Sequence, residues 1–73
     1  MSSDIHESIR ELAINLWDSR ERMTFSELAD ELGFDSAWHA GRAVTNAWRY
    51  YDKRNDSKTC AAITRAFHRE DEA

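Results

Sequence analysis

Apolar residues recur at helical spacing in the first part of the chain. The first set consists of Ile5, Ile9, Leu12 and Leu16. Their intervals of four, three and four residues place them on one face of a helix. Ser3 or Asp4 is expected to cap this helix, because either side chain can accept a hydrogen bond from its first free backbone amides.

A short strand and a second helix are predicted next. Met23 to Phe25 is too short for a helix and rich in strand formers, which indicates a brief strand. Thr24 and Glu27 then have the three-residue spacing of a capping box, and Gly33 is suited to end the helix in the left-handed conformation. Its inward face comprises Leu28, Ala29 and Leu32.

A third helix is predicted over about residues 36–53, beginning at Asp35 or Ser36 and ending before the turn residues Asn55, Asp56 and Ser57. At 100° per residue it separates into two faces. The apolar face comprises Ala37, Ala40, Gly41, Val44, Ala47, Trp48 and Tyr51. The opposite face comprises His39, Arg42, Asn46, Arg49, Tyr50 and Lys53.

The last segment, Thr59 to Phe67, fits two interpretations. Cys60, Ile63 and Phe67 suit a helical stripe, whereas Ala61, Ile63 and Phe67 suit one face of a strand. We favour a strand, which could pair with Met23 to Phe25. The predicted fold is therefore mainly α: a three-helix winged helix-turn-helix with a short strand before the second helix and a C-terminal strand. The alternative is a four-helix all-α bundle.

Size and composition limit the class of protein. Seventy-three residues with 41% hydrophobic content suit one domain, spanning residues 1–73. The single cysteine, Cys60, cannot form an intramolecular disulfide. No export signal and no run of about 18 apolar residues is evident, so we expect a cytoplasmic protein that is not inserted in a membrane.

The charge is distributed unevenly along the chain. Residues 1–35 hold nine acidic and three basic residues, residues 36–69 two acidic and seven basic ones, and residues 70–73 three acidic ones. The total of −4 argues against nucleic acid, but the basic stretch indicates a positive binding face. A solvated surface with uneven charge would explain the same pattern.

The polar face of the third helix carries the residue types that bind nucleic acid. Arginine suits guanine edges or phosphates, asparagine suits adenine, and tyrosine and lysine suit phosphates. The helix follows a short capped helix and a glycine-containing turn, which is the position of a recognition helix. The candidate nucleic-acid-binding residues are Trp38, His39, Arg42, Asn46, Arg49, Tyr50, Lys53, Arg54 and Lys58. An ordinary exposed helix face is the competing interpretation.

The run from Thr24 to Ala47 resembles the winged helix-turn-helix of DNA alkyltransferases and alkyltransferase-like proteins. The residues that carry the resemblance are Thr24, Phe25, Ser26, Glu27, Leu28, Ala29, Gly41, Arg42, Ala43 and Val44. The family's arginine enters DNA in place of an extruded base, so the resemblance implies this role for Arg42. The family's proline-cysteine-histidine-arginine site is absent, since Cys60 lies between Thr59 and Ala61, and no alkyl transfer is implied.

Other chemistry finds little support in the sequence. The histidines His6, His39 and His68 are scattered and offer no metal-ligand spacing. Nothing in the sequence orients Cys60 against a histidine, and a lone cysteine is usually a small core residue. We therefore expect no enzyme, no metal and no cofactor.

Two functions remain as predictions. The first is a small DNA-binding protein, a transcription regulator or accessory factor, that places the third helix in the major groove of double-stranded DNA. The second is a protein-binding adaptor or inhibitor that uses Trp38, expected to be exposed, and the acidic first half. A homodimer would suit either function.

Overall fold

The computed structural model describes residues 2–69, and the side chains of residues 5–69. The first helix begins at Ser2, so Ser3 and Asp4, expected to precede and cap it, lie inside it. The acidic residues 70–72 lie outside the described part. Within it the elements in chain order are α1 (Ser2–Ser19), β1 (Met23–Thr24), α2 (Phe25–Leu32), α3 (Ala37–Lys53), α4 (Ser57–Ala66) and β2 (Phe67–His68). The fold is therefore mainly helical, as the sequence predicts.

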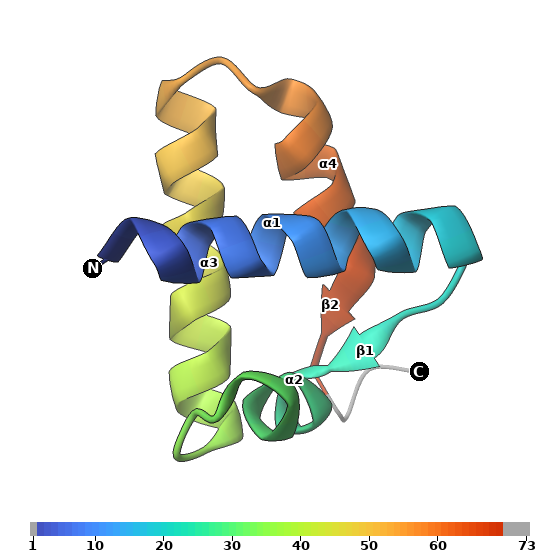
Figure 1. Ribbon diagram of the computed structural model, residues 1–73, viewed down its shortest axis with the longest axis vertical. Helices are drawn as coiled ribbons and strands as arrows, with labels where there is room; N and C mark the ends of the chain where they lie inside the picture. Colours follow the sequence, from blue (N-terminus) through green and yellow to red (C-terminus); the bar gives the residue numbers. More distant parts are fainter. Residues whose placement is uncertain (1, 70–73) are drawn as a thin grey trace.

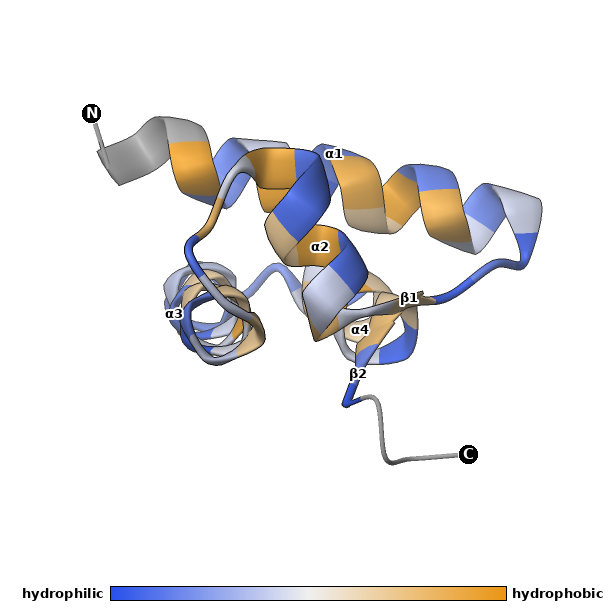
Figure 2. Ribbon diagram, turned by 90° about the horizontal axis from the view of Figure 1, so that it is seen from below, coloured by the Kyte–Doolittle hydropathy of each residue, from blue (hydrophilic) through white to orange (hydrophobic). Residues whose placement is uncertain are grey.

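The helices form two layers. Figure 1 shows α3 and α4 side by side, with α1 crossing in front of both, and Figure 2 shows the same arrangement from below. The molecule measures 30 × 28 × 17 Å, and its shortest dimension runs through these two layers. The helix α2 and the two strands lie together at one end (Figure 1). Within residues 2–69, no other helix covers the side of α3 and α4 that faces away from α1 (Figures 1 and 2).

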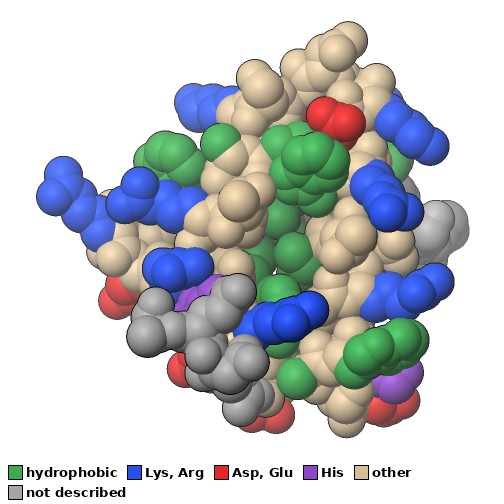
Figure 3. All heavy atoms as spheres, turned by 180° about the vertical axis from the view of Figure 1, so that it is seen from behind, with side chains coloured by type: hydrophobic (Ala, Val, Ile, Leu, Met, Phe, Trp, Pro, Cys, Tyr) green, Lys and Arg blue, Asp and Glu red, His purple; other side chains and the backbone are tan. Residues whose placement is uncertain are grey.

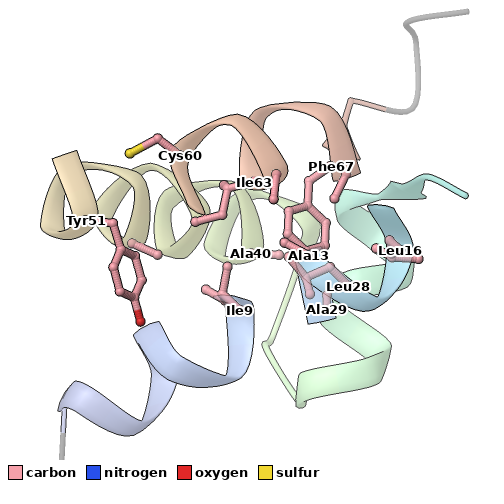
Figure 4. Packing of buried hydrophobic residues seen from close by; sticks show 13 residues of the cluster. Ile9, Ala13, Leu16, Leu28, Ala29, Ala40, Tyr51, Cys60, Ile63 and Phe67 are labelled. Atoms are coloured by element: carbon pink, nitrogen blue, oxygen red, sulfur yellow. The ribbon is translucent and has the colours of Figure 1, made fainter. Parts of the chain in front are cut away.

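A single cluster of buried side chains joins the four helices. The largest fully buried side chains are Ile9 of α1, Leu28 of α2 and Ile63 of α4. From α3 the cluster receives the small side chains Ala40 and Ala47, which let that helix approach its neighbours closely. Figure 4 shows Ile9, Leu28, Ala40 and Ile63 meeting in the common interior. Burial of apolar surface from every helix is the main stabilising contribution.

The predicted ends of α2 are confirmed. The Thr24 backbone N–H donates to Glu27 Oε1 at 2.8 Å, and the Glu27 N–H donates to Thr24 Oγ1 at 3.1 Å, which completes the capping box. At the other end Gly33 has φ 81°, and its N–H donates to the Ala29 carbonyl at 2.8 Å. These local bonds fix where α2 ends and the turn to α3 begins.

The third helix is confirmed at Ala37–Lys53. Ser36 caps it, and its Oγ accepts a hydrogen bond from the His39 N–H at 3.3 Å. The chain leaves the helix through Asn55, which has φ 60°, a left-handed conformation that asparagine tolerates well. The expectation that Trp48 belongs to the core is wrong, since its side chain is 37% exposed.

The prediction of a strand at Thr59–Phe67 is wrong for most of that segment, which forms α4 and becomes a strand only at Phe67–His68. The Asp56 carboxylate accepts hydrogen bonds from the Thr59 N–H at 3.2 Å and the Thr59 hydroxyl at 2.8 Å, and these bonds begin the helix. The four-helix alternative matches the helices but not the strands. The buried set follows the helical stripe and comprises Thr59, Cys60, Ala62, Ile63, Ala66 and Phe67.

The two short strands pair with each other, in parallel. Met23 lies opposite Phe67, and Thr24 lies opposite His68. The predicted strand at Met23 to Phe25 is confirmed for its first two residues, while Phe25 begins α2. The expected pairing of the C-terminal segment with this strand is also present, although only two residues of each strand take part. It brings the end of α4 next to the start of α2.

Candidate functional site

The exposed face of α3 carries four of the candidate residues in a row. Trp38, Arg42, Asn46 and Arg49 are all exposed and lie one helical turn apart, or three residues apart at the end of the row. The opposite face of the same helix is buried in the core at Ala40, Ala47 and Tyr51. The amphipathic pattern of α3 therefore points these four side chains away from the core.

A groove of 830 Å³ runs beside this row, between α3, the start of α2 and the β2 end of the chain. Its apolar lining comes from Phe25, Ala37, Gly41 and Phe67. Trp38 adds an indole ring to the lining. The polar and charged lining residues are Arg42, Thr45, Asn46, Arg49, His68 and Arg69. Figure 3 shows this face, with hydrophobic side chains in the centre and Lys and Arg side chains around them. Among the described residues 5–69, no Asp or Glu side chain lines the groove.

Trp38 and Arg42 form one wall of the groove. The Trp38 side chain is 66% exposed, as expected from its position on the helix, and the Arg42 guanidinium carbon lies 5.7 Å from the centre of its ring. A cation at this distance from an indole ring is attracted by the negative face of the ring. The pair therefore presents a flat apolar surface and a positive charge side by side.

His39 lies at the start of α3 and does not line the groove. Its Nδ1 is 2.8 Å from the Ser36 hydroxyl, and its ring meets the Trp38 ring edge-on, with the centres 5.1 Å apart. The contact with Ser36 orients the His39 ring. The His39 ring in turn packs against one edge of the exposed Trp38 ring.

Tyr50 is turned towards α1. Its ring stacks on His6 of that helix with the centres 4.5 Å apart, and the Arg54 guanidinium carbon lies 4.3 Å from the Tyr50 ring centre. This half-buried cluster separates Tyr50 from the row that includes Arg49. Lys53 and Lys58 are exposed but, like Arg54, do not line the groove.

Sequence reasoning missed the far side of the groove. Phe25, Phe67, His68 and Arg69 were not among the candidate residues, yet all line it. The parallel pairing of β1 with β2 brings Phe67 and His68 beside α2. The expected pairing of the C-terminal segment with Met23 to Phe25 indicated this neighbourhood, but it did not identify Phe67 and His68 as the paired residues.

Cys60 belongs to the core. It is 7% exposed, its thiol donates to the Trp48 carbonyl at 3.4 Å, and burial raises its pKa. A raised pKa lowers the fraction of reactive thiolate. Trp48 and Cys60 border a second, smaller hollow of 460 Å³, where the Arg65 guanidinium carbon lies 5.2 Å from the Trp17 ring centre.

Glu27 lies close to the groove but outside it. Hydrogen bonds from the backbone N–H and the hydroxyl of Thr24 lower the pKa of Glu27, with a smaller contribution from the nearby His68. Its carboxylate is therefore committed to the capping box.

Over residues 2–69, no helix is long and apolar enough to cross a membrane. The same residues contain no group of three or more His, Cys, Asp or Glu side chains arranged to hold a metal ion. Comparison of the chain with protein-family models, curated proteins and solved structures found no match in any of the three.

Proposed function

We propose that this protein binds double-stranded DNA, with α2 and α3 as a helix-turn-helix of the winged type and α3 as the recognition helix. The observation that carries the proposal is the exposed row of Trp38, Arg42, Asn46 and Arg49 on a helix that directly follows a short, doubly capped helix. Recognition helices enter the major groove and contact base edges from their N-terminal half.

The arrangement of the helices supports this geometry. The α2 helix ends at Gly33 and crosses α3 steeply (Figures 1 and 2), while α1 covers only the opposite side of α3. Arg42 and Asn46 would then reach base edges, and Arg49 would contact phosphate. The β1–β2 pair beside the groove would be a much reduced wing.

The separation of charge also supports DNA as the ligand. The acidic residues of the first half lie on α1, α2 and the connections around them, whereas α3 and α4 carry half of the basic residues of the chain. Figure 3 shows basic side chains spread over the face opposite α1, with acidic ones mainly at its lower edge. Local positive charge can attract phosphate even when the net charge of the chain is negative.

Fluorescence anisotropy with a labelled duplex of mixed sequence tests the proposal. If Arg49, Lys53, Arg54 and Lys58 contact phosphates, the logarithm of the binding constant should fall with the logarithm of salt concentration with a slope of about −3 to −4. Arg49→Gln should reduce this slope by about one. Arg42→Gln should weaken binding to a preferred site about 5- to 150-fold if it reads a base.

Arg20→Gln is the matched control, because it removes the same charge from an exposed residue after α1, outside the groove. It should leave the affinity nearly unchanged, and circular dichroism should show all variants folded. Absence of duplex binding at low salt, or equal losses in the three variants, would rule out α3 as a DNA-reading helix.

A second candidate function is a protein-binding module, favoured by the 66% exposure of Trp38. Exposed tryptophans are enriched among residues that dominate protein interfaces. This function predicts that one protein co-purifies with the chain, that Trp38→Ala abolishes the interaction, and that Arg42→Gln and Arg49→Gln do not. Loss of the interaction in the arginine variants alone would count against it.

A further inference from the structure

The groove beside α3 combines features that duplex DNA alone would not use. Its floor is formed by the rings of Phe25 and Phe67 and by the small residues Ala37 and Gly41. Phosphates need cations and amide donors, and they leave an aromatic floor uncovered. The floor therefore indicates a ligand with an apolar part that can fill the groove.

The glycine in α3 lets this floor form. A Cβ atom at Gly41 would lie 3.1 Å from two carbons of the Phe25 ring, a contact tighter than about nine in ten real Cβ contacts. The absence of a side chain thus allows the Phe25 ring to lie directly against the α3 backbone. The exposed indole of Trp38 stands on the same helix, one turn earlier, and adds an aromatic surface at the mouth.

The rim of the groove is positive. Arg42 and Arg49 line it from α3 and Arg69 lines it just beyond β2, and no Asp or Glu among residues 5–69 lines the groove. Guanidinium groups bind planar carboxylates through two parallel hydrogen bonds. The volume of 830 Å³ lies within the range of about 300–1,000 Å³ that is usual for small-ligand sites.

We propose that this groove is a binding site for a small aromatic anion, such as an aromatic carboxylate, with the ring on the Phe25–Phe67 floor and the acid group on Arg42 and Arg49. Charge complementarity selects this ligand class over a neutral one. The 460 Å³ hollow between Trp17 and Trp48 lacks a pair of arginines that could hold an acid group. Among the described residues, Arg65 is its one cationic lining residue, and its guanidinium lies over the Trp17 ring.

Titration with two dyes of similar shape tests the proposal on the intact protein. Anilinonaphthalene sulfonate is an aromatic anion, and N-phenylnaphthylamine is its neutral counterpart; both fluoresce more strongly in an apolar site. We expect the anion to bind with one-to-one stoichiometry and about tenfold or more tighter than the neutral dye, because charged hydrogen bonds add to the same ring contact. Equal affinity of the two dyes would overturn the proposal.

Two pairs of variants locate the site. Ala37→Leu fills the groove, and Ala61→Leu makes the same change in the smaller hollow. The first should weaken the anionic dye about tenfold and the second should not, and the reverse result would assign binding to the hollow and refute the groove. Arg42→Gln should reduce the preference for the anion, whereas Arg20→Gln should keep it. If Ala37→Leu fails to fold, the two arginine variants decide alone, because both residues are exposed.

Binding of the anion does not depend on the proposed DNA function, but one consequence does. Arg42 and Arg49 would serve both ligands, so the anionic dye should displace a labelled duplex while the neutral dye should not. Dye binding without any duplex binding would uphold the groove and refute the DNA proposal. Simultaneous binding of dye and duplex, without displacement, would refute the placement of the acid group on these two arginines.

Discussion

Two adjacent alanines in α4 provide a sharp test of the way this segment packs. Ala62 is 3% exposed and belongs to the core, while Ala61 is exposed beside it. In a strand that turns Ile63 and Ala61 inward, the two positions would exchange: Ala61 would be buried and Ala62 would face solvent. The same substitution at each position therefore distinguishes the helix from the strand.

The expected magnitudes differ widely between the two positions. Ala62→Asp places a carboxylate in the core without a partner, which costs about 3–5 kcal/mol when the charge is not compensated. Ala61→Asp loses only helix propensity, about 0.7 kcal/mol. A chain of 73 residues has roughly 4–11 kcal/mol of total stability at about 0.05–0.15 kcal/mol per residue. The first change should therefore remove a large part of the stability, and the second should be tolerated.

Urea denaturation followed by far-ultraviolet circular dichroism measures both effects. In a thermal melt followed by the same signal, the Tm of Ala61→Asp should lie within a few degrees of that of the unchanged protein, because about 1 kcal/mol shifts Tm by 4–8 °C in a domain of this size. Ala62→Asp should be mostly unfolded, or should unfold at much lower urea. The opposite order of the two variants would refute the packing of α4 described above.

Two further predictions concern the capping box of α2. Thr24→Ala should cost about 1 kcal/mol, because the Glu27 N–H loses its acceptor, and Thr24→Ser should restore most of that loss in the same urea experiment. The pKa of Glu27 is lowered in the folded protein, so its contribution is complete above its unfolded pKa of about 4.3 and is lost as the pH falls through the lower folded pKa. Glu27→Gln, which keeps a capping side chain without the charge, should flatten this acid limb; an unchanged pH dependence would contradict the assignment.

The parts of the fold that sequence reasoning predicted are those fixed by local chemistry. The extents of α2 and α3 follow from caps at Thr24, Gly33 and Ser36, each of which acts within a few residues of itself. The exposed position of Trp38 follows from the helical period of α3. Signals of this kind do not depend on the rest of the chain, which is why they survive folding unchanged.

The last segment required information that its own pattern does not contain. Ile63 and Phe67 satisfy both a helical and a strand periodicity, and the difference lies in Ala61 and Ala62, whose small apolar side chains give no clear polarity. The cap formed by Asp56 with Thr59 was the overlooked local signal for a helix. Packing of α4 against α1 then decides which alanine is buried.

The groove depends still more on contacts between distant segments. An isolated α3 would keep its arginines and Trp38, and with them a charged surface for phosphate. It would lack the aromatic floor, because Phe25 comes from α2 and Phe67 from β2, and the two meet only through the parallel pairing that sets Met23 opposite Phe67. The residues that attract an anion are therefore readable from one helix of the sequence. Those that would select an aromatic one are assembled only by the folded chain.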